Sequence, residues 1–114
     1  MPYISTKTNI ELAKEKQDAL AAEYGRIISL VPGKTERWLM LSFDDKISMY
    51  FGGKGDEPMA YIELSLFGGA SDAVYDKLPA AICDAVSAET GIAPANIYVK
   101  YEEAEHWGWN GSNF

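Results

Sequence analysis

The sequence is poor in the residues that form disulfides and metal sites. It has one cysteine, Cys83, and one histidine, His106. A single cysteine cannot form an internal disulfide, and Cys83 falls on the apolar side of a predicted helix, which favours a core position over a nucleophile. His106 has no companion residues at metal-ligand spacing, so we expect no metal site.

Long apolar runs and a surplus of positive charge are also missing. No segment approaches the roughly 18 apolar residues of a membrane span, and the polar stretch 2–15 lacks the apolar core of a signal peptide. The chain carries 10 Lys and Arg against 17 Asp and Glu, a net charge of −7. Nucleic acid is a poor candidate partner because phosphate binding needs clustered cations. We expect a cytoplasmic protein with no membrane partner, and any secretion would need a route without a signal peptide.

What the sequence does contain is an internal repeat. With 114 residues, of which 47% are hydrophobic, the chain has the size of a single domain, 1–114. A shift of 58 residues places Tyr3 on Tyr61, Ile4 on Ile62 and Gly33 on Gly91. Both halves have the pattern of a strand, a helix and a strand, so we expect two similar βαβ units.

The predicted elements follow from hydrophobic spacing and from helix-ending residues. The expected strands are Tyr3–Thr8, Trp38–Asp44, Met59–Phe67 and Ile97–Tyr101, with short strands at Ile47–Phe51 and near Trp107–Trp109. The first expected helix is Glu11–Leu30, with Asn9 as a candidate N-cap. Ser71 is expected to cap the second helix and Gly91 to end it. Pro79 predicts either a kink in that helix or a regular part that begins only near Leu78.

The predicted fold is α+β, with a four-stranded mixed sheet and both helices on one face, because the two crossovers should share one hand. The other face of the sheet would have no helix over it. The segment Trp38–Phe43 is apolar on both sides, which is typical of a strand buried on both faces. We therefore expect self-association through the bare faces, with a covering loop as the alternative. The longest loop, Gly52–Pro58, is short and polar.

Pro2 is the first candidate functional residue, because it directly follows the initiator methionine. If Met1 is removed, the nitrogen of Pro2 is a free secondary amine. Burial or a nearby cation lowers the pKa of such an amine from about 8 and leaves a base poised near neutrality. If Met1 is retained, the nitrogen is an amide and cannot act as a base. The structural alternative is that Pro2 merely begins a strand, where the missing N–H costs nothing.

The C-terminal run from Trp107 to Phe114 is the second unusual segment. It combines two tryptophans and a final phenylalanine with Gly and Asn residues. Aromatic side chains bury large areas, so this tail should dock against the body of the protein or against a neighbour. Taken alone, the tail favours packing over a functional role.

Together these features resemble the macrophage migration inhibitory factor family of the tautomerase superfamily. The resemblance spans the chain with one short deletion after Phe67. The motifs that carry it are Met1-Pro2 before a strand, Gly33-Lys34 after the first helix, Phe51-Gly52-Gly53, Glu57-Pro58, Ile97-Tyr98-Val99 and the run Gly108-Trp109-Asn110-Gly111-Ser112-Asn113-Phe114. The resemblance implies a homotrimer whose three sheets enclose a central barrel.

The resemblance also implies an activity: cofactor-independent keto–enol tautomerisation of aryl pyruvates, as in a phenylpyruvate tautomerase, and often dopachrome isomerisation. Pro2 would be the catalytic base, Lys34 would bind the substrate carboxylate or carbonyl oxygen, and the backbone of Phe67 would contact substrate. One alternative is a cytokine-like signalling protein that binds a receptor protein and whose pocket activity is vestigial. Another is a structural oligomer with an inert N-terminus.

The remaining expected site residues are aromatic, with one cation. The resemblance implies that the substrate ring is enclosed by Trp38, Trp107, Trp109, Phe114 and Tyr98, the last from a neighbouring subunit. Lys100 stands where the family often has a substrate-binding asparagine. It would either favour anionic substrates and lower the pKa of Pro2 further, or point to solvent. Some relatives carry a Cys-x-x-Cys where this chain has Met59–Ile62, so no thiol–disulfide activity is expected.

Overall fold

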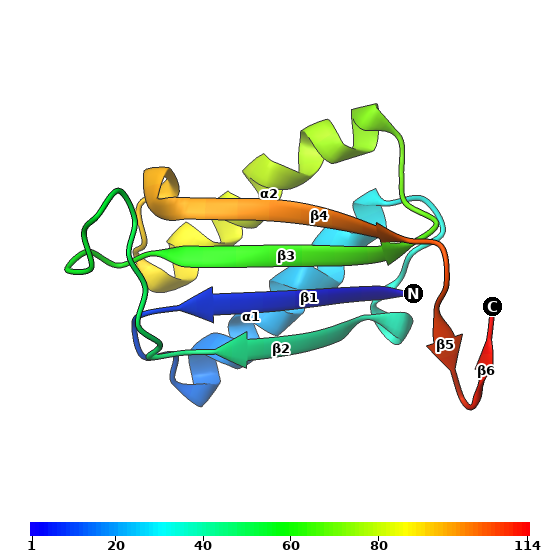
Figure 1. Ribbon diagram of the computed structural model, residues 1–114, viewed down its shortest axis with the longest axis horizontal. Helices are drawn as coiled ribbons and strands as arrows, with labels where there is room; N and C mark the ends of the chain where they lie inside the picture. Colours follow the sequence, from blue (N-terminus) through cyan, green and yellow to red (C-terminus); the bar gives the residue numbers. More distant parts are fainter.

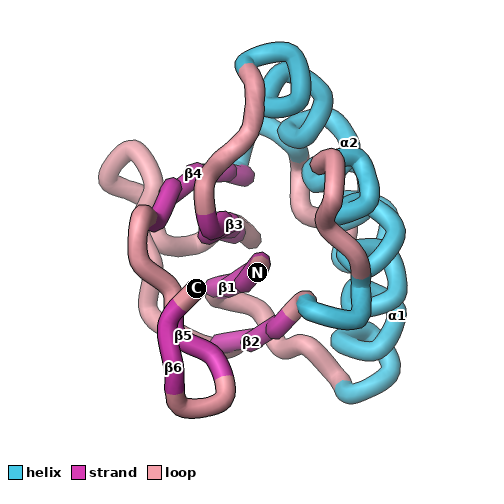
Figure 2. Tube along the Cα trace, turned by 90° about the vertical axis from the view of Figure 1, so that its right-hand side faces the viewer, coloured by secondary structure: helices cyan, strands magenta, loops and turns pink.

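Four strands form one mixed sheet in the computed structural model, which describes all residues from 1 to 114. In spatial order they are β2 (Met40–Asp44), β1 (Pro2–Thr8), β3 (Ala60–Phe67) and β4 (Ile97–Ala104). β1 and β3 are antiparallel, whereas β1–β2 and β3–β4 are parallel pairs. Helices α1 (Lys14–Ile27) and α2 (Asp72–Thr90) both cover the same face of the sheet (Figure 1, Figure 2). The predicted two-layer α+β fold is confirmed.

The hydrophobic core lies between the sheet and the two helices. Every second residue of β1 and β3 is buried, as expected for strands with one covered face. The helices contribute the apolar stripes predicted from their spacing, and these are fully buried: Leu20, Tyr24, Ile28, Leu78, Ile82 and Val86. Neither helix combines the length and the apolar composition that crossing a membrane requires.

The beginning of α1 differs from the prediction. The helix begins at Lys14, and its N-cap residue is Ala13, which makes no side-chain capping bond. Asn9 is not the N-cap, because its side chain bonds to the backbone just before β3. Its Nδ2 donates to the Glu57 carbonyl (2.8 Å), and its Oδ1 accepts from the Met59 N–H (2.9 Å). A short 3₁₀ turn, Ile28–Leu30, follows the helix.

Both predicted ends of α2 are confirmed. The Ser71 hydroxyl accepts from the Val74 N–H, and Gly91 ends the helix in the left-handed conformation with φ 75°. Pro79 lies inside one continuous helix that begins at Asp72. The alternative in which the regular helix begins only near Leu78 is therefore wrong, because the remaining backbone bonds and the packed face of the helix outweigh the one bond that proline removes.

The segment after β2 does not form the predicted strand Ile47–Phe51. Phe51 makes only an isolated bridge to Lys54, closed by a tight turn through two glycines with positive φ, so its backbone groups bond within the turn. Trp38 belongs to a 3₁₀ turn, Glu36–Trp38, that precedes β2. At the C-terminus, β5 (Gly108–Trp109) and β6 (Ser112–Asn113) form a small hairpin at the same end of the sheet as the N-terminus (Figure 1).

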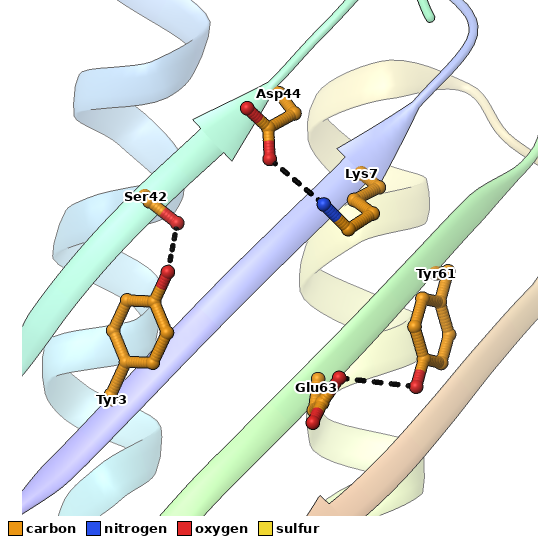
Figure 3. Close-up of polar contacts among 6 residues, drawn as sticks. All are labelled: Tyr3, Lys7, Ser42, Asp44, Tyr61 and Glu63. Carbon is orange, nitrogen blue, oxygen red and sulfur yellow. Dashed lines mark hydrogen bonds and ion pairs between the residues drawn. The ribbon is translucent and has the colours of Figure 1, made fainter. Parts of the chain in front are cut away.

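The bare face of the sheet is more polar than predicted. Leu41 and Phe43 pack against the core, while Met40 points away from it and is 69% exposed, so β2 alternates instead of being apolar on both sides. Polar pairs join side chains on the exposed face (Figure 3), namely Tyr3–Ser42 (2.6 Å), Lys7–Asp44 (3.1 Å) and Tyr61–Glu63 (3.2 Å). Self-association through this face stays a prediction.

Candidate active site

The largest groove of the protein lies where the first residues of the chain meet the beginning of β2, the ends of β3 and β4, and the C-terminal hairpin. Its volume is about 930 Å³. Of the predicted site residues, the groove is lined by Pro2, Trp38, Trp107 and Trp109. Residues from both ends of the chain and from the start of β2 therefore come together in one place.

Pro2 begins β1 and is buried opposite Leu66 of β3. Met1 precedes it in the structure and also lines the groove. The Met1 carbonyl accepts a hydrogen bond from the Phe67 N–H (3.1 Å), so the pairing of β1 and β3 continues to the first residue. In this form of the chain, the titratable nitrogen at the groove belongs to Met1.

Lys34 stands beside this N-terminal amine. The chain turns back at Gly33 after the 3₁₀ turn that follows α1, and the Lys34 N–H bonds to the Val31 carbonyl (3.0 Å). The Lys34 ammonium donates to the Phe67 carbonyl (3.1 Å). Burial, as the largest cause, and the hydrogen bonding and positive charge of Lys34 together lower the pKa of the N-terminal amine to about 6. An amine at this position is largely uncharged at neutral pH.

Aromatic side chains enclose one side of the groove. Trp38 and Trp109 meet edge to face with ring centroids 5.1 Å apart, and Trp109 stacks on Phe114 at 6.3 Å. Phe114 in turn contacts Phe67 at 5.7 Å, and its N–H bonds to the Trp107 carbonyl (3.0 Å). The C-terminal tail is thus docked on the body of the protein. It leaves Trp109 50% and Phe114 57% exposed, which provides apolar surface for a ligand.

The other predicted site residues do not line the groove. Lys34 and Phe67 contact Met1, and Phe114 stacks on Trp109. Tyr98 and Lys100 lie elsewhere within the chain. Tyr98 is at the opposite end of β4, where it pairs with Tyr61, contacts Phe51 (centroids 4.9 Å apart) and lines a second groove of about 560 Å³. Lys100 is on the exposed sheet face, where it forms an ion pair with Glu102 (2.5 Å) that raises the pKa of the lysine. Neither residue lines the groove that contains Pro2.

The structure also adds charged residues that the sequence analysis did not select. Arg37 lines the groove, with its guanidinium 5.0 Å from the Trp38 ring centroid. Glu102 and Glu103 line it because β4 continues to Ala104, beyond the predicted end at Tyr101. The sequence could have indicated Arg37, because it directly precedes the predicted site residue Trp38. It did not indicate Glu102 and Glu103, because two consecutive glutamates are typical of a solvent-exposed loop. No three His, Cys, Asp or Glu side chains gather in the geometry of a metal site.

The mixed sheet with strand order β2-β1-β3-β4, two helices on one face and a proline at the start of an inner strand is the tautomerase-superfamily fold. The sequence profile of the macrophage migration inhibitory factor (MIF) family matches residues 1–114. The chain belongs to this family. A comparison with curated protein sequences finds no match.

Solved structures agree with this assignment. MIF2 from Leishmania major is 34% identical, with a TM-score of 0.93 over 100% of this chain and 97% of that one. The MIF-like protein from Entamoeba histolytica is 23% identical, with a TM-score of 0.86 over 99% of this chain and 98% of that one. Pt0534 inactivated by 2-oxo-3-pentynoate is 17% identical, with a TM-score of 0.81 over 96% and 93% of the two chains. The similarities to the last two structures show only that the folds agree.

Proposed function

We propose that this protein is a cofactor-independent keto–enol tautomerase of aryl pyruvates, of the phenylpyruvate tautomerase type, with Pro2 as the base after removal of Met1. The main support is the environment of the N-terminal amine. Burial and Lys34 lower the pKa of the Met1 amine to about 6. The Pro2 nitrogen is one residue further into the same buried strand, so the same two causes lower the pKa of the Pro2 amine in the processed chain. A base with a pKa near neutrality suits proton transfer at pH 7.

The reaction needs one base and one cation. Pro2 removes a proton from the carbon next to the ketone, and the electron pair of that C–H bond moves to the carbonyl oxygen. Lys34 stabilises the negative charge that develops on this oxygen. The proton then passes from Pro2 to the oxygen, which gives the enol and restores the free amine. No electrons are gained or lost, so the reaction requires no redox cofactor.

The aromatic side of the groove supports an aryl substrate. Trp38, Trp107 and Trp109 line the groove together with Pro2, and Phe114 stacks on Trp109. A phenyl or hydroxyphenyl ring gains from such contacts beyond the area it buries. The activity extends to dopachrome derivatives, which are also flat aromatic carbonyl compounds. Phe67 completes this part of the site through its backbone, which holds Lys34.

We further propose a homotrimer in which Tyr98 of one subunit reaches the groove of the next. Tyr98 is 63% exposed and lies beside Tyr50, which is 74% exposed. Exposed aromatic residues around an apolar groove are typical of surfaces that bind another chain. Lys100 stays a candidate for binding anionic substrates from the sheet face. The proposed location is the cytoplasm.

The experiment compares the processed wild-type chain with Pro2→Gly in the interconversion of phenylpyruvate enol and keto forms, followed by ultraviolet absorbance. Intact mass first establishes that Met1 has been removed. Pro2→Gly replaces the secondary amine, whose direction the ring fixes, with a flexible primary amine, and should lower kcat by roughly a hundredfold or more. Pro94→Gly, at a 3₁₀ turn away from the groove, is the matched control and should keep the wild-type rate. Equal rates for wild type and Pro2→Gly would contradict the proposal.

Membership of the MIF family supports a second function, signalling through a receptor protein outside the cell. In that case the pocket activity is vestigial. Receptor binding would then survive Pro2→Gly, whereas the tautomerase rate would not. A binding assay on the two proteins that gave equal affinity, together with a negligible wild-type rate, would favour this second function.

A further inference from the structure

The loop that joins β3 to α2 supplies the carbonyl that holds Lys34. It runs from Phe67 through Gly68 and Gly69 to Ala70, and α2 begins two residues later. The Phe67 carbonyl accepts from the Lys34 ammonium (3.1 Å), and the Gly68 N–H donates to the Ala104 carbonyl at the end of β4 (3.0 Å). The position of Lys34 beside the N-terminal amine therefore depends on how this loop is held.

The Glu103 carboxylate is the only side chain whose oxygen bonds to the backbone of this loop. One of its oxygens, Oε2, accepts from the Ala70 N–H (3.2 Å) and from the Tyr75 hydroxyl (2.6 Å). These two bonds lower the pKa of the Glu103 carboxyl, the Tyr75 bond being the larger cause, so the group is a carboxylate at neutral pH. Hydrogen bonds to an ionised acceptor are stronger than those between neutral groups.

The surroundings of Glu103 are adapted to this contact. A Cβ at Gly69 would lie 1.8 Å from Glu103 Oε2, and Gly69 has a φ of +80°, so glycine alone allows the carboxylate to approach the loop. On the other side, the Tyr75 ring packs on Tyr101 with centroids 4.9 Å apart, which fixes the direction of the phenol. The deletion after Phe67 that the family resemblance implies falls in this loop, which is short enough to be held by one side chain.

We propose that Glu103 is a positioning residue for the reaction: it holds the loop from Phe67 to Ala70 so that the Phe67 carbonyl keeps the Lys34 ammonium beside the N-terminal nitrogen. This inference rests on the proposed function. The connection runs from Glu103 through Ala70 and Phe67 to Lys34 and involves no contact between Glu103 and the N-terminal nitrogen. The other charged groups around the groove are Arg37 and Glu102, which line it together with Glu103.

The test compares Glu103→Ala and Glu103→Gln in the processed chain. Two quantities are measured: the pKa of the Pro2 amine, from the pH dependence of its ¹⁵N chemical shift in proline-labelled protein, and kcat/KM for phenylpyruvate. Glu103→Ala frees the loop, so the pKa should rise by roughly half a unit to one unit as Lys34 moves away. The rate constant should fall by roughly tenfold to a hundredfold.

Glutamine keeps an oxygen that can accept from the Ala70 N–H and the Tyr75 hydroxyl, so Glu103→Gln should retain most of the wild-type pKa and rate. The comparison of Glu103→Ala with Glu103→Gln therefore separates the effect of the lost hydrogen bonds from the effect of the lost negative charge. Glu105→Ala, an exposed position that lines neither groove, is the matched control for the loss of one negative charge. It should leave both quantities unchanged.

The inference is overturned if Glu103→Ala keeps the wild-type pKa of Pro2, or if Glu103→Gln loses as much as Glu103→Ala. Tyr75→Phe serves where Glu103→Ala does not fold, since it removes one of the two bonds and keeps the ring contact with Tyr101. It should give a smaller rise of the pKa, and an unchanged pKa would also overturn the inference. Because the ¹⁵N measurement needs no turnover, an inactive wild-type chain with a pKa that responds to Glu103→Ala would refute the proposed function alone.

Discussion

At the scale of single residues, the proposed site combines one cation with a partly buried amine at the start of β1. Lys34 lies at the end of a turn and has an acceptor, the Phe67 carbonyl, that fixes its ammonium. In sequence, a lysine after a helix is ordinarily a solvated surface charge. Its functional role could be predicted only from the family resemblance, because its partner is 33 residues away along the chain.

Substitution of Lys34 should therefore change both the rate and its pH dependence. Lys34 lowers the pKa of the N-terminal amine, so Lys34→Ala should raise that pKa and shift the acid limb of the rate profile to higher pH. Loss of the charge that stabilises the enolate should lower kcat by roughly 10²–10³-fold. Lys77→Ala, an exposed lysine on α2, is the control. A profile for Lys34→Ala with the wild-type acid limb would contradict the assigned role.

At the scale of elements, one buried hydrogen bond joins β1 to α1. The Thr6 hydroxyl and the Tyr24 hydroxyl are 2.8 Å apart, and Thr6 is 1% and Tyr24 0% exposed. Burial raises the pKa of Tyr24 to about 12, so the phenol stays protonated over the whole range in which the protein would be used. The bond links the strand that begins with Pro2 to the helix whose end leads to Lys34.

Removal of one partner of this bond should destabilise the fold. Tyr24→Phe leaves the Thr6 hydroxyl buried and unpaired and should lower the free energy of unfolding by about 1–3 kcal/mol in urea titrations. Tyr3→Phe removes a hydroxyl bond on the half-exposed sheet face, where water can replace it, so its cost should be smaller. The double variant Tyr24→Phe, Thr6→Val should lose less than the sum of its single variants. Additive losses would contradict the pairing.

The helices and strands differ in how well they follow from the sequence. Periodicity predicted both helices and all four sheet strands because burial against one face imposes a regular spacing of apolar residues. The prediction was wrong where a side chain bonds to residues far away in the sequence. Asn9, the expected N-cap of α1, instead bonds to Glu57 and Met59, just before β3. The prediction also ended β4 at Tyr101, so Glu103 was not expected to lie in a strand. Contacts of this kind depend on the assembled fold and leave no local pattern.

At the scale of the whole molecule, Tyr98 and Pro2 lie at different grooves of one chain, so the role proposed for Tyr98 requires a site shared between subunits. Light scattering should give the mass of a trimer. Mixed trimers formed by refolding Pro2→Gly together with Tyr98→Ala should recover part of the tautomerase rate, because some sites then combine Pro2 from one subunit with Tyr98 from the other. Each variant refolded alone provides the control. A monomer in solution, or no recovery in the mixture, would contradict the shared site.

The bond between the Phe67 N–H and the Met1 carbonyl has a consequence for maturation. Excision of Met1 deprives this N–H of its acceptor at the edge of the groove, and an unpaired donor there is costly until another oxygen replaces the lost one. A single cleavage therefore uncovers an amine and opens an anchoring point for an incoming carbonyl or carboxylate. Before that cleavage Met1 lines the groove and its carbonyl occupies the Phe67 N–H, so the Pro2 amine and this donor would become available to a ligand together, through the same cut.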